Sequence, residues 1–134
     1  RFTDNALRCL MFLGTTGSSV VTVGEVARRM SMSEDHLLKV VRRLVELGYV
    51  RTIRGRRGGV QLARLPGDIV IGEVVRATED NLALVPCFEP DCRPCPLSPD
   101  CSLAASLEDA VGAFFAVLQG RTLADLIHPI PTVG

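Results

Sequence analysis

Four of the five cysteines in this chain lie within fifteen residues, between Cys87 and Cys101. Five of the eight prolines lie in this segment or directly before it, interspersed with acidic residues. The segment has no helical or strand periodicity and too little apolar material to fold by burial alone. Thiolates are strong metal ligands, so a metal centre is the expected source of order here.

The cysteine spacing, C-x4-C-x2-C-x5-C, is compatible with three kinds of site. A disulfide set is disfavoured by the odd number of cysteines and by the absence of a signal-like segment at the start of the chain. A structural zinc site could use Cys92 and Cys95 as one C-x2-C knuckle, completed by Cys87 and Cys101, but the usual second knuckle is missing. An iron-sulfur cluster tolerates looser spacing and often has proline beside a ligand, as in Cys95-Pro96, so the spacing modestly favours it.

Charge is divided unevenly along the chain, although the formal net charge is zero. Residues 1–64 carry twelve basic and five acidic side chains, whereas the remainder carries three basic and ten acidic ones. This division predicts a basic module that faces phosphate, joined to an acidic one. Two solvated surfaces with chance clustering of charge are the alternative.

The length of 134 residues, 47% of them hydrophobic, suffices for one compact core or for a small domain with a helical appendage. Uninterrupted apolar runs are shorter than the roughly 18 residues that a membrane span requires. No signal-like segment opens the chain. We therefore expect a cytoplasmic protein that does not bind a membrane.

Three helices are expected before the middle of the chain. The first covers residues 3–13, and the second follows Thr22, which has the spacing of a capping box. A turn over residues 31–33 separates it from the third, residues 34–47, which Gly48 ends. A short helix, a tight turn and a second amphipathic helix are typical of a helix-turn-helix, whose second helix enters the DNA major groove.

Residues 49–63, YVRTIRGRRGGVQLA, have β-branched residues on either side of a glycine-rich tip, which predicts a β-hairpin. A helix-turn-helix followed by a basic hairpin is the order of a winged helix-turn-helix, so we expect a mostly α protein with a small β-wing. A glycine-rich nucleotide loop is a weaker alternative, because such loops lead from a strand into a helix and a strand follows this one.

Two further helices are expected, over residues 71–79 and 102–119. The longer one has a coiled-coil-like seam that predicts a dimerisation helix, with an ordinary core helix as the alternative. Residues 1–66 would form the DNA-binding domain, and residues 67–134 the metal-binding loop and dimerisation helix. The residues of the expected dimer interface are Leu103, Leu107, Ala110, Phe114 and Val117.

The third helix and the hairpin tip hold the candidate DNA contacts. Lys39, Arg42 and Arg43 would bind phosphates, whereas Asp35 and His36 lie near the helix start and are better placed for base edges. Guanidinium groups on the tip suit phosphate oxygens, guanine edges or a narrow minor groove. Alternatively, each of these side chains is a solvated surface residue that does not contact DNA. The candidate set is Ser33, Asp35, His36, Lys39, Arg42, Arg43, Arg54, Arg56 and Arg57.

With FTDNALRCLMFL, HLLKVVRRLVELGYV, TIRGRRGGVQLA, IGEVVRATED and the cysteine loop in this order, the chain resembles the Rrf-type family of bacterial winged-helix iron-sulfur repressors over nearly its whole length. The resemblance implies a homodimer crossed by the long C-terminal helix. It also implies an iron-sulfur cluster, 4Fe-4S in the first instance and 2Fe-2S as the alternative.

In this family three cysteines of the loop bind the cluster, and the matching positions here are Cys87, Cys95 and Cys101. Cys92 is surplus and could replace Cys87 or act as a further ligand. In the nitric-oxide-sensing branch an aspartate of the Phe-Thr-Asp motif, donated by the partner subunit, completes the set, and here that residue is Asp4. A helix N-cap is the alternative role for Asp4.

The resemblance therefore implies a DNA-binding repressor that responds to nitric oxide, with nitrosylation of the cluster releasing DNA. An iron-responsive or redox-responsive repressor of the same family is the alternative. An iron-sulfur electron carrier is the alternative from another class, against which the arginine-rich hairpin argues. No arrangement of nucleophile, base and oxyanion-binding groups suggests an enzyme.

Overall fold

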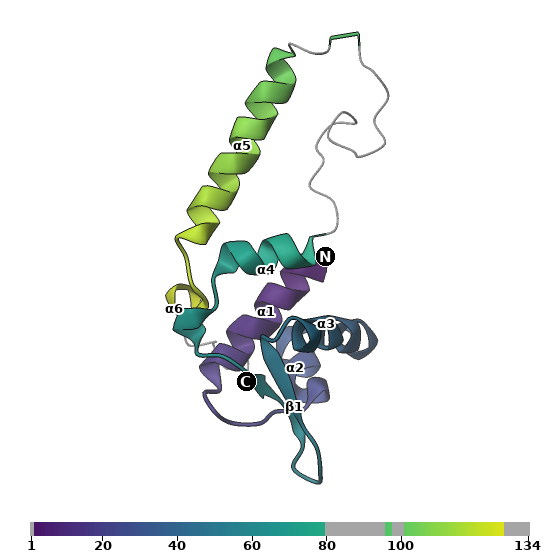
Figure 1. Ribbon diagram of the computed structural model, residues 1–134. Coiled ribbons are helices and arrows are strands. Elements are labelled where there is room, and N and C mark those ends of the chain that lie inside the picture. Colours follow the sequence, from purple (N-terminus) through teal and green to yellow (C-terminus); the bar gives the residue numbers. More distant parts are fainter. Residues whose placement is uncertain (1, 80–95, 98–100, 128–134) are drawn as a thin grey trace.

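The computed structural model describes residues 2–79, 96–97 and 101–127 of the chain. Cys87, Cys92 and Cys95 therefore lie outside the described residues. The described elements are six α-helices, one short 3-10 helix and one two-stranded sheet, which confirms the expected mostly α fold with a small β-wing. Figure 1 shows the helices gathered around α1, with the hairpin projecting at one end and α5 at the other.

Helix α1 (Phe2–Thr15) lies at the centre of the buried core. Its apolar face repeats at helical spacing and is buried at Ala6, Cys9, Leu10, Phe12 and Leu13. The helix already includes Phe2, so Asp4 lies within its first turn rather than at the N-cap position. Asp4 is therefore not the N-cap of α1, contrary to the alternative role considered for it.

Helices α2 (Val23–Met30) and α3 (Glu34–Glu46) form the expected helix-turn-helix. The Thr22 hydroxyl accepts a hydrogen bond from the backbone N–H of Glu25 at 3.1 Å, and the Ser33 hydroxyl accepts one from the N–H of His36 at 3.4 Å. These bonds satisfy helix donors that would otherwise lack a partner. Ser31 adopts a left-handed conformation (φ 55°) and ends α2.

Strands β1 (Val50–Ile53) and β2 (Gly59–Leu62) form the antiparallel wing, with Val50 opposite Leu62 and Ile53 opposite Gly59. The N–H groups and carbonyls of Val21 and Val60 exchange hydrogen bonds of 3.1 and 2.7 Å, which attach the wing to the segment before α2. A Cβ atom at Gly59 would collide with the carbonyl of Val21, so this close approach requires glycine.

The half-buried base of the wing carries one polar side chain with both of its groups satisfied. The Gln61 side-chain oxygen accepts from Nε of Arg51 at 2.8 Å, and its nitrogen donates to the carbonyl of Ser18 at 2.8 Å. Buried polar groups stabilise a structure only when they are paired in this way. The bonds fix the direction in which the hairpin leaves the helices.

The second half of the chain consists of the 3-10 helix η1 (Pro66–Asp68), α4 (Ile71–Thr78), α5 (Ser102–Gln119) and α6 (Leu123–Leu126). Backbone bonds join Ile71 N–H to Arg121 O at 2.9 Å and Leu123 N–H to Ile69 O at 2.8 Å. One buried cluster includes side chains from both halves of the chain, among them Leu13, Leu44, Ile69, Val74, Phe115 and Leu123.

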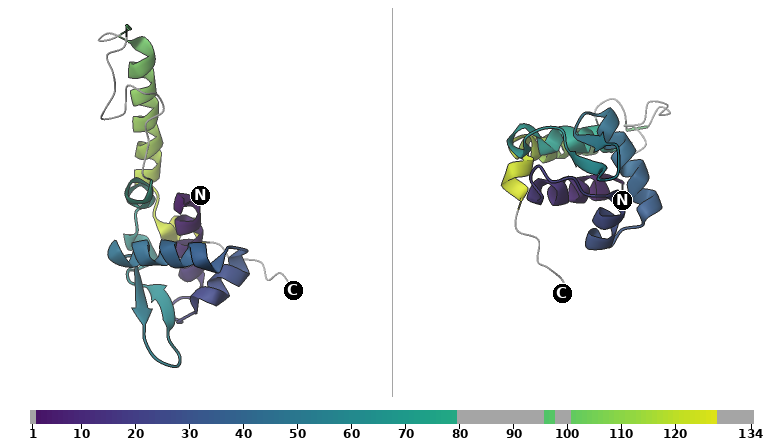
Figure 2. Two further views of the ribbon diagram at one scale, coloured as in Figure 1. Left: turned by 90° about the vertical axis from the view of Figure 1, so that its right-hand side faces the viewer. Right: turned by 90° about the horizontal axis from the view of Figure 1, so that it is seen from below.

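Among the described residues, only the C-terminal end of α5 packs on the other helices. Phe115 is the single buried residue of this helix, and the Arg76 guanidinium of α4 lies over its ring at 3.9 Å. The rest of α5 extends away from the body, as both views agree (Figures 1 and 2). Leu103, Phe114 and Val117 remain 50–59% exposed. The core-helix alternative does not describe this helix.

Helix α5 is also the one helix of the described residues that is long and apolar enough, by length and composition, to cross a membrane. Uninterrupted apolar runs are short in this chain, but the 18 residues of α5 taken together are apolar enough despite Glu108 and Asp109. Its exposed apolar side instead has the pattern of a helix that packs on another helix.

Candidate nucleic-acid interface

The exposed side of α3 is almost wholly charged, because its apolar residues Leu37, Val40, Val41 and Leu44 all turn into the core. Ser33, which caps the helix, is also exposed. Most of the predicted DNA contacts lie on this side. The exposed residues of α3 are Glu34, Asp35, Leu38, Lys39, Arg42, Arg43 and Glu46.

His36 differs from the other residues predicted to contact DNA, because it is half-buried. Its ring meets the ring of Phe2 edge-on, with 6.3 Å between centroids and an interplanar angle of 83°. Its Nε2 atom is buried and has no hydrogen-bond partner among the described residues. This geometry turns His36 toward the start of α1 rather than toward solvent.

The wing tip places Arg54, Arg56 and Arg57 on an exposed turn. Gly55 has a φ of +113°, and its carbonyl accepts a hydrogen bond from the N–H of Gly58 at 3.0 Å, which closes the turn. None of the three guanidinium groups pairs with a carboxylate within the described residues. They are therefore positioned to bind phosphate oxygens.

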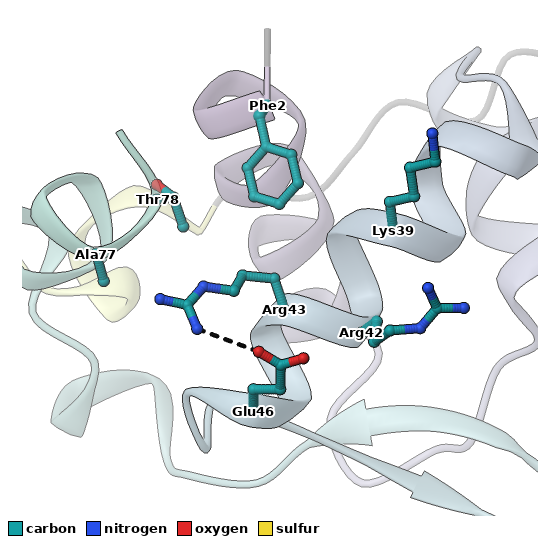
Figure 3. A pocket seen from close by; sticks show the side chains of 7 residues that line it. All are labelled: Phe2, Lys39, Arg42, Arg43, Glu46, Ala77 and Thr78. Carbon is teal, nitrogen blue, oxygen red and sulfur yellow. Dashed lines mark hydrogen bonds and ion pairs between the residues drawn. The ribbon is translucent and has the colours of Figure 1, made fainter. Parts of the chain in front are cut away.

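A cavity of about 260 Å³ separates α3 from the first turn of α1 and the end of α4 (Figure 3). Arg43 extends across it toward Ala77 and pairs with Glu46 of its own helix at 3.2 Å, whereas Arg42 points the other way. Residues from three elements thus meet beside α3, the expected recognition helix of the helix-turn-helix. They are Phe2, Lys39, Arg42, Arg43, Glu46, Ala77 and Thr78.

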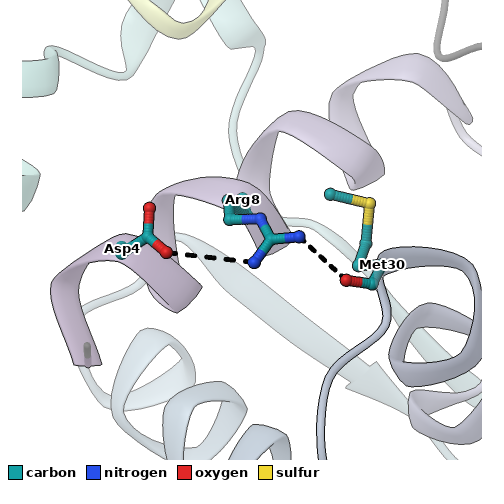
Figure 4. Close-up of polar contacts among 3 residues, drawn as sticks. All are labelled: Asp4, Arg8 and Met30. Carbon is teal, nitrogen blue, oxygen red and sulfur yellow. Dashed lines mark hydrogen bonds and ion pairs between the residues drawn. The ribbon is translucent and has the colours of Figure 1, made fainter.

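The first turn of α1 is connected to the helix-turn-helix through Arg8 (Figure 4). Nη1 of Arg8 lies 3.9 Å from the Asp4 carboxylate, and its Nη2 donates to the carbonyl of Met30 at 2.8 Å. Met30 is the last residue of α2, directly before the turn that leads to α3. The Asp4 side chain is 68% exposed, so its carboxylate is free to bind a further partner.

The same turn of α1 is also bonded to the end of α4. The Thr3 hydroxyl donates to the Glu79 carboxylate at 2.9 Å, and the Thr78 hydroxyl lies 3.1 Å from the Thr3 hydroxyl. Thr78 and Glu79 directly precede the segment that leads to the cysteines. The start of α1 therefore joins the recognition helix, the end of α2 and the approach to the cysteine loop.

Of the predicted metal ligands, the structure describes Asp4 and Cys101. Cys101 is half-buried and occupies the N-cap position of α5. The start of α5 and the start of α1 lie at different places in one protomer (Figure 1), and the described residues contain no group of three or more potential metal ligands. Asp4 of the same chain is thus not placed beside Cys101.

Cys9 is fully buried in α1, as its place beside apolar residues predicts. Burial raises the pKa of its thiol to about 12, which disfavours the thiolate form that binds metals. This residue is unsuited to metal binding.

Several residues around the site were not singled out by sequence reasoning, notably Phe2, Arg8, Leu38 and Thr78. Arg8 alone had a sequence signal, because it follows Asp4 by four residues and can pair with it on one helix face. The bonds of Arg8 to Met30 and of Thr78 to Thr3 span 22 and 75 residues, which no local pattern reveals.

The family model Rrf2, described as an iron-dependent transcriptional regulator, matches residues 1–129. The HTH-type transcriptional regulators NsrR of Geobacillus kaustophilus and Bacillus subtilis are 49% and 46% identical to this chain; the alignments cover 95% and 94% of the chain and 87% of each relative. Among solved structures, IscR of T. potens superposes with a TM-score of 0.74 at 27% identity, over 94% of this chain and 82% of that one.

Proposed function

Because this chain belongs to the Rrf2 family of transcriptional regulators, we propose that it is a homodimeric repressor whose iron-sulfur cluster senses nitric oxide. Like its relatives, it is a DNA-binding regulator and not an enzyme. The observation that carries the proposal is the Asp4 carboxylate, which is exposed in the first turn of α1 and is connected through Arg8 to the helix-turn-helix.

The DNA surface comprises α3 and the wing tip. Lys39 and Arg42, neighbours on one face of α3, bind phosphates beside the groove that α3 enters, and Arg54, Arg56 and Arg57 bind the neighbouring backbone or minor groove. Asp35, exposed at the start of α3, faces base edges. His36 acts differently, because its contact with Phe2 positions α3 instead of reading DNA.

The donor set fits an iron-sulfur cluster. Cys101 offers a thiol at the start of α5, Cys87 and Cys95 complete the three thiolates, and Asp4 of the partner subunit supplies one oxygen; Cys92 is the alternative ligand. The separation of Asp4 from the start of α5 within one protomer supports donation by the partner. A 4Fe-4S or 2Fe-2S cluster held by these residues would supply iron to which nitric oxide could bind.

The dimer forms through α5. Leu103, Phe114 and Val117 are exposed, and together with Leu107 and Ala110 they make a seam that suits the same helix of a second copy. Residues 67–134 would then be the metal-binding and dimerisation part, and residues 1–66 the DNA-binding part. No membrane takes part, and the protein acts in the cytoplasm.

Asp4 is the proposed trigger, because a carboxylate is a harder ligand than a thiolate and is the weaker partner for iron. A released Asp4 carboxylate can pair with Arg8, whose guanidinium also holds the end of α2. The Thr3 and Phe2 contacts transmit the same change to α4 and α3. Half-sites are read at a fixed spacing, so a small rotation of the two recognition helices releases DNA.

Iron-responsive repression is the second candidate, because the matching family model carries the description of an iron-dependent regulator. A visible absorption spectrum of anaerobically purified protein separates the two. A brown chromophore that changes promptly with stoichiometric nitric oxide supports the proposal. A chromophore that ignores the gas but decays with an iron chelator supports the second candidate, and colourless protein with bound zinc contradicts both.

A further inference from the structure

Leu38 is the one apolar residue among the seven exposed residues of α3, and its side chain is 43% exposed. Single exposed leucines are common on protein surfaces, so exposure alone assigns no role. The position of Leu38 does suggest a role. The other six exposed residues of α3 are all charged, and α3 is the recognition helix of a DNA-binding regulator.

Helix geometry places Leu38 on the side of α3 that the rest of the protomer leaves open. A helix turns by about 100° per residue, so Leu38 lies about 160° around the axis from His36. The His36 side is covered by Phe2. Leu38 therefore lies on the opposite flank, one turn after Glu34 and one turn before Arg42.

Leu38 is the fifth residue of α3, in the half of the helix that starts at the capped end. In helix-turn-helix proteins this half reaches the base edges, while basic residues farther along bind the backbone. Lys39 and Arg42 are the neighbouring cations, and both are exposed. Their binding to phosphates would hold the side chain of Leu38 against the floor of the major groove.

The major-groove edges of the four base pairs present donors, acceptors and one apolar group, the C5-methyl of thymine. We propose that Leu38 is a specificity-determining residue that reads a thymine in each half-site through contact with this methyl group. The inference rests on the proposed DNA-binding function. Leu37 and Val41, the other apolar residues nearby, are buried in the core and cannot reach a base.

The test replaces thymine by uracil, which removes the methyl group and leaves every hydrogen-bonding group in place. The operator is first selected from random double-stranded DNA with the full-length, anaerobically purified protein. Each thymine of the half-sites is then replaced in turn, and the dissociation constant is measured by fluorescence anisotropy. The variants are Leu38→Ala, Leu38→Met as a conservative replacement, and Leu65→Ala as a matched exposed leucine outside α3.

We expect one thymine position at which uracil weakens binding roughly fourfold per half-site for the parent, Leu38→Met and Leu65→Ala proteins. For Leu38→Ala, uracil at that position should make no difference. If Leu38→Ala keeps the full loss, or if no thymine shows one, the assignment of Leu38 is wrong while DNA binding stands. If no sequence is enriched at all, the proposed function fails with it.

Discussion

Asp4 lies in the first turn of α1 with an exposed carboxylate, and Arg8 follows one turn later with a guanidinium that also bonds Met30. An exposed ion pair of this length stabilises a fold very little. The pair matters because Arg8 also bonds the end of α2, a connection that an isolated surface pair would not have.

Replacing Asp4 by Ala should leave the thiolate ligands intact and the protein coloured, yet reduce the ratio of DNA affinities between cluster-loaded and cluster-free protein toward one. Couplings of this kind typically amount to about 5- to 150-fold in the parent protein. Fluorescence anisotropy of both forms measures the ratio. Asp68→Ala, which removes an exposed carboxylate of η1, is the control. An unchanged ratio in Asp4→Ala would remove Asp4 from the mechanism.

Replacing Cys101 by Ser should abolish the visible chromophore, because a serine hydroxyl is a poor substitute for a thiolate. Cys92→Ser should keep it. Iron content and absorbance of the anaerobically purified variants report the outcome. A colourless Cys92→Ser protein would show that the three thiolates were chosen wrongly.

Cys9 should not react with iodoacetamide at pH 8 in the folded protein, because burial raises the pKa of its thiol to about 12. In urea the thiol becomes accessible and should be modified. The raised pKa also makes stability depend on pH. Above about pH 9 the Cys9 thiol ionises in the unfolded chain but stays protonated in the folded protein, so the free energy of unfolding falls as pH rises toward 12. Mass spectrometry of the modified peptide checks the first statement, and rapid modification of folded protein would contradict it.

At the scale of helices and strands, local sequence signals were sufficient to predict the DNA-binding elements. Thr22 caps α2 as the sequence predicts, Ser33 caps α3, and the glycine-rich tip forms the turn of the wing. The buried faces of α1 and α3 follow from helical spacing. These features depend on residues a few positions apart, which is why they could be predicted.

Contacts between distant segments could not be predicted in this way. The sequence suggested base contact for His36, but the orientation of its ring depends on Phe2, which lies on another helix. The bond between Thr78 and Thr3 joins the end of α4 to the start of α1. Such pairs depend on how whole helices pack, so the connection between the Asp4 turn and the recognition helix became visible only in the structure.

The basic residues of α3 and the wing should act on DNA through phosphates. Lys39→Ala and Arg54→Ala should each weaken binding and lower the slope of log K against log salt by about two, since each subunit of the dimer loses one phosphate contact, without changing the visible spectrum. Arg121→Ala, an exposed arginine in the acidic half, is the control. Full affinity in both variants would move the DNA surface elsewhere.

At the scale of the whole molecule, α5 leaves a long apolar side uncovered, since only Phe115 is buried in one protomer. A charge placed in the seam should therefore separate the subunits. Phe114→Glu is expected to yield monomers in analytical ultracentrifugation, whereas Ala105→Glu, on the other side of the helix, should leave the dimer intact. A dimeric Phe114→Glu protein would place the interface on another surface.

The wing and α3 lie at one end of the core, while the start of α5 with Cys101 lies at the other (Figure 2). A signal received near Cys101 can reach the DNA surface through the partner subunit, or within one protomer through α4 or α6, which both contact α1. The contacts of Thr3, Phe2 and Arg8 make α1 the element where both routes meet.

The most direct test of the central claim follows DNA binding and colour in one anaerobic titration with nitric oxide. Fluorescence anisotropy of the labelled operator and visible absorbance are recorded on the same sample. We expect the chromophore to change and the operator to dissociate over the same range of added gas. A chromophore that changes fully while the operator remains bound would contradict it.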